Sequence, residues 1–200
     1  MKKEISSIGA LILAGGQNRR MNGYHKALLP LNERTLLEHL AVVFSGFDEK
    51  LIATDMPELA AMADFIQIAD EIPGLGPLGG LSAALTVCRS QALVVCACDM
   101  PLLTTAFAEY LAGLAFTYPD ARAIILKDRS GRVHPLCGLY NKSASSVLLT
   151  ALRQKEYRVM NLFKKLDGVI IPLEQTEFPD SILTNINTVR DWEQFISPDK

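Results

Sequence analysis

The sequence predicts an α/β protein, with a mainly parallel sheet flanked by helices in three layers. Apolar runs of strand length alternate with helical patterns from the start of the chain, which is typical of such sheets. Hydrophobic residues make up 49% of the 200 residues, and a chain of this size can bury a core without disulfides or a structural metal. We therefore expect a single domain over residues 1–200.

The first predicted strand covers residues 5–13 and lies centrally in the sheet. A polar, glycine-bearing stretch at 14–26 follows it as a loop, and long loops in compact domains are usually functional. Thr35 and Glu38 have the spacing of a capping box, and apolar residues then recur on one helical face over 36–44. This part of the chain therefore reads as strand, loop and covering helix.

The following elements continue the alternation up to two aspartates. They are a strand at 50–54, a helix at 56–63, a strand at 65–68, a Gly/Pro-rich segment at 70–80, a helix from about 81 to 89 and an apolar strand at 92–98. Asp70 and Asp99 each lie at the end of a strand. Open α/β sheets bind ligands at the carboxyl ends of their strands, so we expect these aspartates at neighbouring strand ends.

The second half of the chain contains a predicted hairpin. The expected elements are a helix at 105–116, a strand at 121–126, a turn at 128–132, a strand at 133–140, helices at 143–154 and 159–166, a strand at 169–172 and a final helix at 188–196. The short turn between two apolar runs indicates that they pair. Trp192, on the last helix, is interpreted as a packing residue.

Charge and hydropathy exclude several function classes. The formal net charge of −2 gives no basic field for nucleic acid or acidic membranes. No apolar run approaches the roughly 20 residues of a membrane span, and the N-terminus lacks the apolar core of a signal peptide. Cys88, Cys96 and Cys98 lie in apolar segments, as free thiols of reducing compartments do. We expect a cytoplasmic protein.

The loop after the first strand predicts a phosphate site. Gly15 and Gly16 have no side chain, so backbone N–H groups can approach phosphate closely. Arg19, Arg20 and Lys26 supply counter-charge, although a solvated turn is the alternative interpretation. Neither Ser nor Thr follows the lysine, which disfavours a P-loop NTPase.

Asp99 is the candidate metal ligand. A carboxylate on a rigid strand end suits Mg²⁺ when substrate phosphates complete the coordination shell, and Pro101 stops the strand just beyond it. Asp70 precedes the Gly/Pro-rich segment and could serve the metal or a nucleoside. The alternative for both is a capping or surface aspartate.

Two competing motifs are weaker. Residues 74–79 match the dinucleotide pattern G-x-G-x-x-G, but Pro77 removes one N–H from a turn meant to donate to pyrophosphate. Cys96 and Cys98, with His134 and Cys137, could form a zinc set, but buried strand cysteines are the favoured interpretation.

The chain resembles the molybdenum cofactor guanylyltransferase family (MobA), within the nucleotidyltransferase superfamily. The matching blocks are Leu13-Ala14-Gly15-Gly16 with Arg19-Arg20-Met21 and Lys26, Gly76-Pro77-Leu78-Gly79-Gly80, Cys98-Asp99-Met100-Pro101, His134-Pro135, Arg158-Val159-Met160 and Asn185-Ile186-Asn187-Thr188. The first block is shared with sugar and cytidylyl enzymes, and the later blocks narrow the resemblance. The resemblance implies a Rossmann-like nucleotidyltransferase fold.

It also implies an activity: transfer of GMP from GTP to the terminal phosphate of molybdenum-carrying molybdopterin, with release of pyrophosphate. The N-terminal half would bind the nucleotide and Mg²⁺, with Asp99 on the metal, through Leu13, Ala14, Gly15, Gly16, Lys26, Asp70 and Asp99. Lys26 and Arg20 would neutralise developing charge. The C-terminal half would bind the acceptor near Arg158, Asn185 and Asn187, and other proteins of molybdenum cofactor biosynthesis are candidate partners.

Two residues depart from the family pattern. Asn22 stands where the family usually has Gly, and His25 where it usually has Asp before the lysine. Asn tolerates left-handed backbone, whereas losing an acid beside Lys26 alters the charge near the triphosphate. The alternatives are a related nucleotidyltransferase using CTP or a sugar phosphate, a non-catalytic nucleotide- or cofactor-binding protein, and a nicotinamide enzyme.

Overall fold

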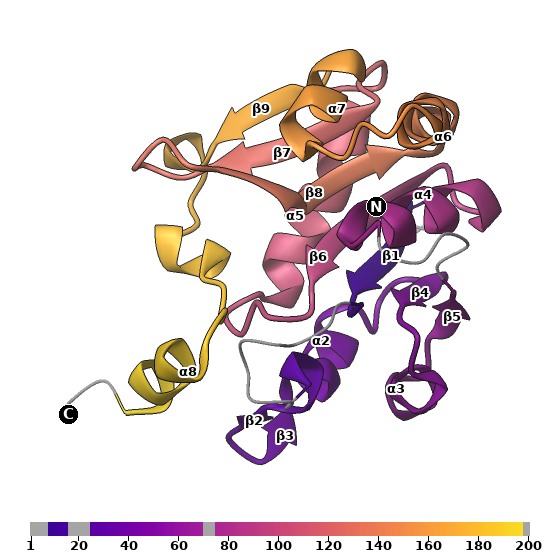
Figure 1. The fold of residues 1–200 in the computed structure, drawn as a ribbon. Helices are drawn as coiled ribbons and strands as arrows, with labels where there is room; N and C mark the ends of the chain where they lie inside the picture. Colours follow the sequence, from indigo (N-terminus) through magenta and orange to yellow (C-terminus); the bar gives the residue numbers. More distant parts are fainter. Residues whose placement is uncertain (1–7, 16–24, 70–74, 198–200) are drawn as a thin grey trace.

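The computed structural model describes residues 8–15, 25–69 and 75–197, and Figure 1 shows their fold. The strands are β1 (Ile8–Leu13), β2 (Pro30–Leu31), β3 (Arg34–Thr35), β4 (Lys50–Ala53), β5 (Ile66–Ile68), β6 (Ala92–Ala97), β7 (Ala123–Lys127), β8 (Val133–Asn141) and β9 (Val169–Pro172). The α-helices are α2 (Leu36–Val43), α3 (Pro57–Ala63), α4 (Pro77–Val87), α5 (Thr105–Thr117), α6 (Ser145–Arg153), α7 (Val159–Lys165) and α8 (Val189–Ile196). Short 3₁₀ turns are η2 (Lys26–Leu28), η3 (Lys142–Ala144), η4 (Leu173–Gln175) and η5 (Asp180–Leu183).

Seven strands form one sheet in the order β5-β4-β1-β6-β8-β7-β9. β1 pairs in parallel with β4 and β6, β4 with β5, and β7 with β9. β8 runs antiparallel to both of its neighbours, β6 and β7. The predicted mainly parallel sheet with β1 at its centre is confirmed.

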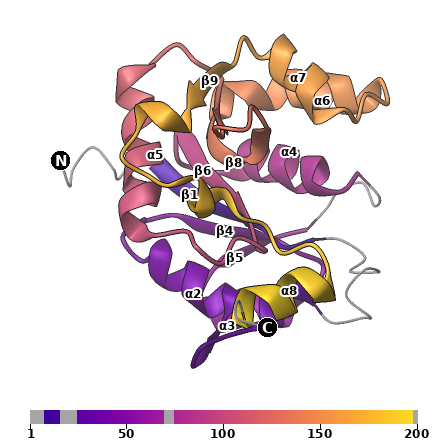
Figure 2. The same cartoon turned by 90° about the vertical axis from the view of Figure 1, so that its left-hand side faces the viewer.

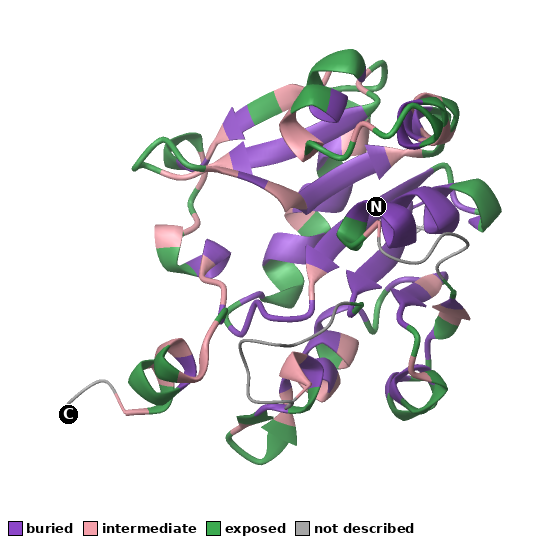
Figure 3. Cartoon of the chain, in the orientation of Figure 1, coloured by how far each residue is buried: buried purple, intermediate pink, exposed green. Residues whose placement is uncertain are grey.

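Helices cover both faces of the sheet, as Figure 2 shows. Ala10 and Ile12 of β1 join the core under α2, α3 and α5, whereas Leu11 and Leu13 join the core under α4, α6 and α7. Successive side chains of a strand point to opposite faces, so a strand that is apolar throughout is buried on both. In Figure 3 the strands are accordingly mostly buried and the outer sides of the helices exposed. This is the three-layer arrangement that the sequence predicts.

The C-terminal helix packs outside these layers, on the hairpin formed by β2 and β3. Trp192 is buried with Leu29, Leu36 and Ile186, so its interpretation as a packing residue is confirmed. Thr188 caps α8 in a capping box with Asp191. The chain just before α8 is thereby held against the main domain.

Three expectations need correction. The helix predicted from about residue 81 begins at Pro77, because proline is well suited to the first helical position and Gly76 adopts φ 60° before it. The β2–β3 hairpin, with Asn32 in the left-handed region, was not predicted. Asp70 and Asp99 do not follow neighbouring strands, because β4 and β1 lie between β5 and β6, although Asp70 itself is outside the described residues.

The predicted hairpin of β7 and β8 is confirmed, and it contains a bulge. Ile125 pairs with Gly138, but the next residue, Leu126, pairs with His134. Pro135 lies in this irregular stretch, where its missing N–H costs no ladder bond. The Tyr140 hydroxyl donates to the Pro135 carbonyl oxygen, which holds the bulge in place. Since β8 is antiparallel to β6, the bulged start of β8 lies at the carboxyl end of β6.

None of the helices within the described ranges is long and apolar enough to cross a membrane.

Candidate active site

The site is built around Asp99, two residues beyond the end of β6. Its side chain is largely buried, and the preceding residue ties the strand end to β1, because the Cys98 N–H donates to the Leu13 carbonyl oxygen at 3.0 Å. Lys26 Nζ lies 2.7 Å from Asp99 Oδ2. An ion pair therefore joins the first residue of η2 to the carboxyl edge of the sheet.

Two asparagines of the C-terminal segment complete this cluster. Asn185 Nδ2 donates to Asp99 Oδ1 at 2.8 Å, and Lys26 Nζ donates to Asn187 Oδ1 at 3.2 Å. The backbone N–H of Ile186 donates to the Asp99 carbonyl oxygen at 2.9 Å. Both amides thus face one way, as an extended Asn-Ile-Asn segment requires. Asp99 and Asn187, which lie 73 and 161 positions after Lys26 in the sequence, thus meet it at one point.

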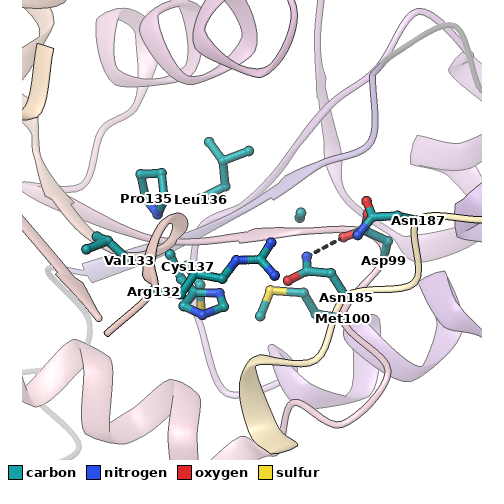
Figure 4. A pocket seen from close by; sticks show the side chains of 11 residues that line it. Asp99, Met100, Arg132, Val133, Pro135, Leu136, Cys137, Asn185 and Asn187 are labelled. Carbon is teal, nitrogen blue, oxygen red and sulfur yellow. Dashed lines mark hydrogen bonds between the residues drawn. The ribbon is translucent and has the colours of Figure 1, made fainter. Parts of the chain in front are cut away.

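A cavity of about 220 Å³ opens beside the cluster, between β6, the start of β8 and the C-terminal segment (Figure 4). Its walls combine polar and apolar side chains. The lining residues are Ala97, Asp99, Met100, Arg132, Val133, His134, Pro135, Leu136, Cys137, Asn185 and Asn187. In Figure 4 the guanidinium of Arg132 is directed across this space toward Asn185. The arrangement suits a small anionic molecule with an apolar part.

Asp128 organises the far wall of the cavity. Its Oδ1 accepts from Ser130 Oγ at 2.6 Å and from the Arg132 N–H at 2.9 Å, and its Oδ2 lies 2.9 Å from His134 Nε2. The hydrogen bond from His134, and then that from Ser130, lower the pKa of Asp128 to about 2. An ionised carboxylate only accepts hydrogen bonds, so His134 Nε2 carries the proton in this pair. Asp128 and Arg132 were not predicted as site residues, because the turn composition of residues 128–132 was their only signal in the sequence.

His25 has a structural role at the start of η2. Its Nδ1 accepts from the Ala27 N–H at 3.3 Å, which makes it the N-cap of the turn that carries Lys26. A neutral imidazole therefore caps this turn without adding charge beside Lys26. Burial lowers the pKa of His25, and the neighbouring Ala14 carbonyl opposes that shift only in part. The neutral ring that the cap needs is therefore the favoured form.

Replacing His25 separates the effect of its capping hydrogen bond from the effect of its titration. Because its pKa in the folded protein lies below its ordinary value of 6.5, the unfolded chain takes up the proton first, and stability falls as the pH drops below that value. We expect His25→Asn, which caps without titrating, to reduce this loss between about pH 7.5 and about pH 5.5. His25→Ala should cost about 0.5–2 kcal/mol at neutral pH. Denaturant unfolding measures both, and parallel pH profiles for wild type and His25→Asn would contradict the assignment.

The structure describes only some of the other predicted site residues. Leu13 and Ala14 are buried at the end of β1, and Gly15 follows them in open surroundings. Gly16, Arg20 and Asp70 lie outside the described residues, as do Arg19 and Asn22. Arg158 is exposed before α7 and does not line the cavity that Asn185 and Asn187 share.

The alternative interpretation of the strand cysteines and His134 as a zinc set finds no support in the described residues. They contain no group of three or more His, Cys, Asp or Glu side chains arranged to hold a metal. Cys96, Cys98 and Cys137 are buried and free, and burial raises the pKa of Cys98 and of Cys137 to about 12. Such thiols stay protonated, so the interpretation of the strand cysteines as buried packing residues is confirmed.

Comparison with known proteins decides the family. Residues 10–169 match the model of the MobA-like NTP transferase domain. The chain belongs to this family. The MobA-like chain is 30% identical over 197 residues to a probable molybdenum cofactor guanylyltransferase of Carboxydothermus hydrogenoformans, with 96% of each chain covered. It is 32% identical to a protein of the same description from Peptoclostridium acidaminophilum, over 93% of this chain and 87% of the relative.

A solved structure supports the fold of this MobA-like chain. Molybdopterin-guanine dinucleotide biosynthesis protein A of Archaeoglobus fulgidus superposes with a TM-score of 0.78 at 24% identity, covering 96% of this chain and all of that one. The G-x-G-x-x-G match lacks the context of a dinucleotide fingerprint, because β5 ends at Ile68 and the first glycine of the match, Gly74, does not follow that strand directly. Gly76 is the N-cap of α4, and Pro77, its first residue, has no N–H to donate.

Proposed function

We propose that the protein transfers GMP from GTP to the terminal phosphate of molybdopterin and releases pyrophosphate. The observation that carries this proposal is the Lys26–Asp99–Asn185–Asn187 cluster, which joins the loop after β1 to the C-terminal segment at the ligand-binding edge of the sheet. The curated relatives that share about 30% identity over nearly the whole chain are described as molybdenum cofactor guanylyltransferases. The choice of guanine and of molybdopterin rests on those relatives.

The reaction needs no protein nucleophile. An oxygen of the acceptor's phosphate attacks the α-phosphorus of GTP, the bond from that phosphorus to the bridging oxygen breaks, and pyrophosphate leaves with the bonding electrons. Catalysis is then positioning and charge stabilisation. Lys26, held by Asp99 and Asn187, would neutralise charge on the phosphates, and we assign the same role to Arg20.

We assign Asp99 as the carboxylate that would hold magnesium. Mg²⁺ is usually held by one or two carboxylates with substrate phosphates and water, and Asp99 presents one carboxylate at the strand end. When bound, the metal would neutralise phosphate charge. Lys26 and Asn185 engage the two Asp99 oxygens and fix the orientation of the carboxylate. Asp70 is proposed as a further residue on the metal or nucleoside, and residues 13–16 as the backbone that approaches the nucleotide.

The two substrates would lie on opposite sides of β6. β1 and its loop, on one side, are assigned to GTP, and the start of β8 with the C-terminal segment, on the other, to the acceptor. We place the enzyme in the cytoplasm, where four free buried thiols persist, and infer that proteins of the same biosynthetic route supply the acceptor.

The test is pyrophosphate release with Mg²⁺, measured through coupled pyrophosphatase. We expect release from GTP only when molybdopterin is added, and at least about tenfold less with CTP or UTP, a difference of about 1.4 kcal/mol. Preference for CTP would favour the related cytidylyl activity. No release with any nucleotide, despite nucleotide binding, would indicate a binding protein rather than an enzyme.

A further inference from the structure

We propose that Arg132 binds the phosphate of the acceptor, and that Asp128 and His134 are positioning residues that hold it for this task. This inference rests on the proposed function and adds to it the cation of the acceptor site. Arg158, which the sequence resemblance implies near the acceptor, does not line this cavity and stays a separate prediction.

The charges around the cavity favour Arg132. It is the single arginine or lysine among the described residues that line this space, and Figure 4 shows its guanidinium directed toward Asn185. No carboxylate in the described part of the chain forms a salt bridge with it. A planar guanidinium presents paired N–H donors that match phosphate oxygens, so this unpaired fork facing a polar cavity suits a phosphate.

The position of Arg132 in the sheet favours the acceptor over the nucleotide. β6, which ends at Asp99, lies between β1 and β8. The loop proposed for GTP follows β1, whereas Arg132 directly precedes β8. A phosphate held between Arg132 and Asn185 would therefore approach the reacting centre at Asp99 from the side opposite the nucleotide, as in-line attack on the α-phosphorus requires.

Asp128 and His134 fix the turn that carries Arg132. Asp128 Oδ1 accepts from the backbone N–H of Arg132, and its Oδ2 accepts from His134 Nε2 in the wall of the cavity. The Asp128 N–H also donates to the Arg132 carbonyl oxygen at 2.9 Å. This ring of hydrogen bonds explains how an exposed turn can aim one long side chain, since holding its backbone lowers the ordering cost of binding.

The experiment compares Arg132→Ala, Arg132→Lys and Asp128→Asn with wild type, with Arg129→Ala as the control. Arg129 lies on the same turn, is exposed and does not line the cavity. Steady-state turnover gives kcat and the KM of each substrate, and equilibrium dialysis gives the Kd for molybdopterin without turnover. Thermal unfolding of every variant checks folding.

We expect Arg132→Ala to raise the KM and Kd for molybdopterin about tenfold or more, as loss of a charge-assisted hydrogen bond predicts, while the KM for GTP changes less than about twofold. Arg132→Lys should fall in between, and Asp128→Asn should raise the acceptor KM. The thermal stability of the Arg129→Ala control should be unchanged. An unchanged molybdopterin Kd in Arg132→Ala, or an effect confined to the GTP KM, would overturn the inference. If wild type binds molybdopterin without transferring GMP to it, the proposed function fails while the Kd comparison still decides the role of Arg132.

Discussion

Asp99→Ala should lower kcat by about 10²–10³-fold, the range seen when a group that stabilises transition-state charge is removed. Asp99 bonds Lys26 through one oxygen and Asn185 through the other, so its loss frees both neighbours as well as removing the proposed metal ligand. Asp99→Asn keeps the shape but not the charge, and we expect a loss of similar size. Lys26→Ala should fall in the same range, because its ammonium is the described cation closest to Asp99.

Steady-state turnover with GTP, acceptor and Mg²⁺ measures these losses, and Asp64→Asn is the matched control. Asp64 is an exposed aspartate paired with Lys50, and Asn tolerates its left-handed backbone at φ 56°. The control should keep wild-type turnover. Wild-type turnover in Asp99→Ala would show that the chemistry lies elsewhere.

Gly138→Ala should destabilise the fold by about 3 kcal/mol or more, the upper range for overpacking. Gly138 lies in β8 between β6 and β7, and a Cβ built there would be 2.1 Å from the Ile124 carbonyl oxygen and 3.1 Å from Ile125 Cα. Both obstacles are backbone atoms of the paired strand, so they cannot move aside as a flexible side chain could. The strands would have to separate next to the bulge that forms the cavity wall.

Urea unfolding of Gly138→Ala measures this cost, with Gly113→Ala as the control. Gly113 lies in α5 with no atom within 4 Å of its added Cβ, so alanine there should stabilise the protein by about 0.5–1 kcal/mol through helix propensity. Equal unfolding free energies for Gly138→Ala and wild type would contradict the close approach of β7 and β8.

Local patterns sufficed for most of the fold. Strand β9 has its predicted bounds, Thr35 and Glu38 form the predicted capping box, and Asp99 lies just beyond the end of an apolar strand. Each of these features depends on residues that are near one another in the sequence. The start of α4 escaped prediction since the Gly/Pro composition of residues 70–80 resembles a loop. Only its tertiary setting, with Gly79 and Gly80 buried in the core, shows why small residues occupy a helix there.

Part of the candidate site could likewise be predicted from the sequence and part could not. Lys26, Asp99, Asn185 and Asn187 could be selected as residues, but their mutual hydrogen bonds span the chain and follow from the strand order. The opposite wall could not be anticipated, because the bulge in β8 and the Asp128 turn depend on how β8 pairs with β6 and β7. For the same reason the sequence placed Asp70 and Asp99 on neighbouring strands, whereas β4 and β1 separate β5 from β6.

The measurement that most directly tests nucleotide transfer at the Lys26–Asp99 cluster follows the phosphates of GTP. The protein is incubated with molybdopterin, Mg²⁺ and GTP labelled either at the α- or at the γ-phosphate, and the products are separated. We predict that the α-label joins the acceptor in a stable GMP conjugate, that the γ-label leaves as pyrophosphate, and that Asp99→Ala and Lys26→Ala slow both by about 10²–10³-fold. Transfer of the γ-label to the acceptor, or its release as inorganic phosphate with no α-labelled conjugate, would contradict that mechanism.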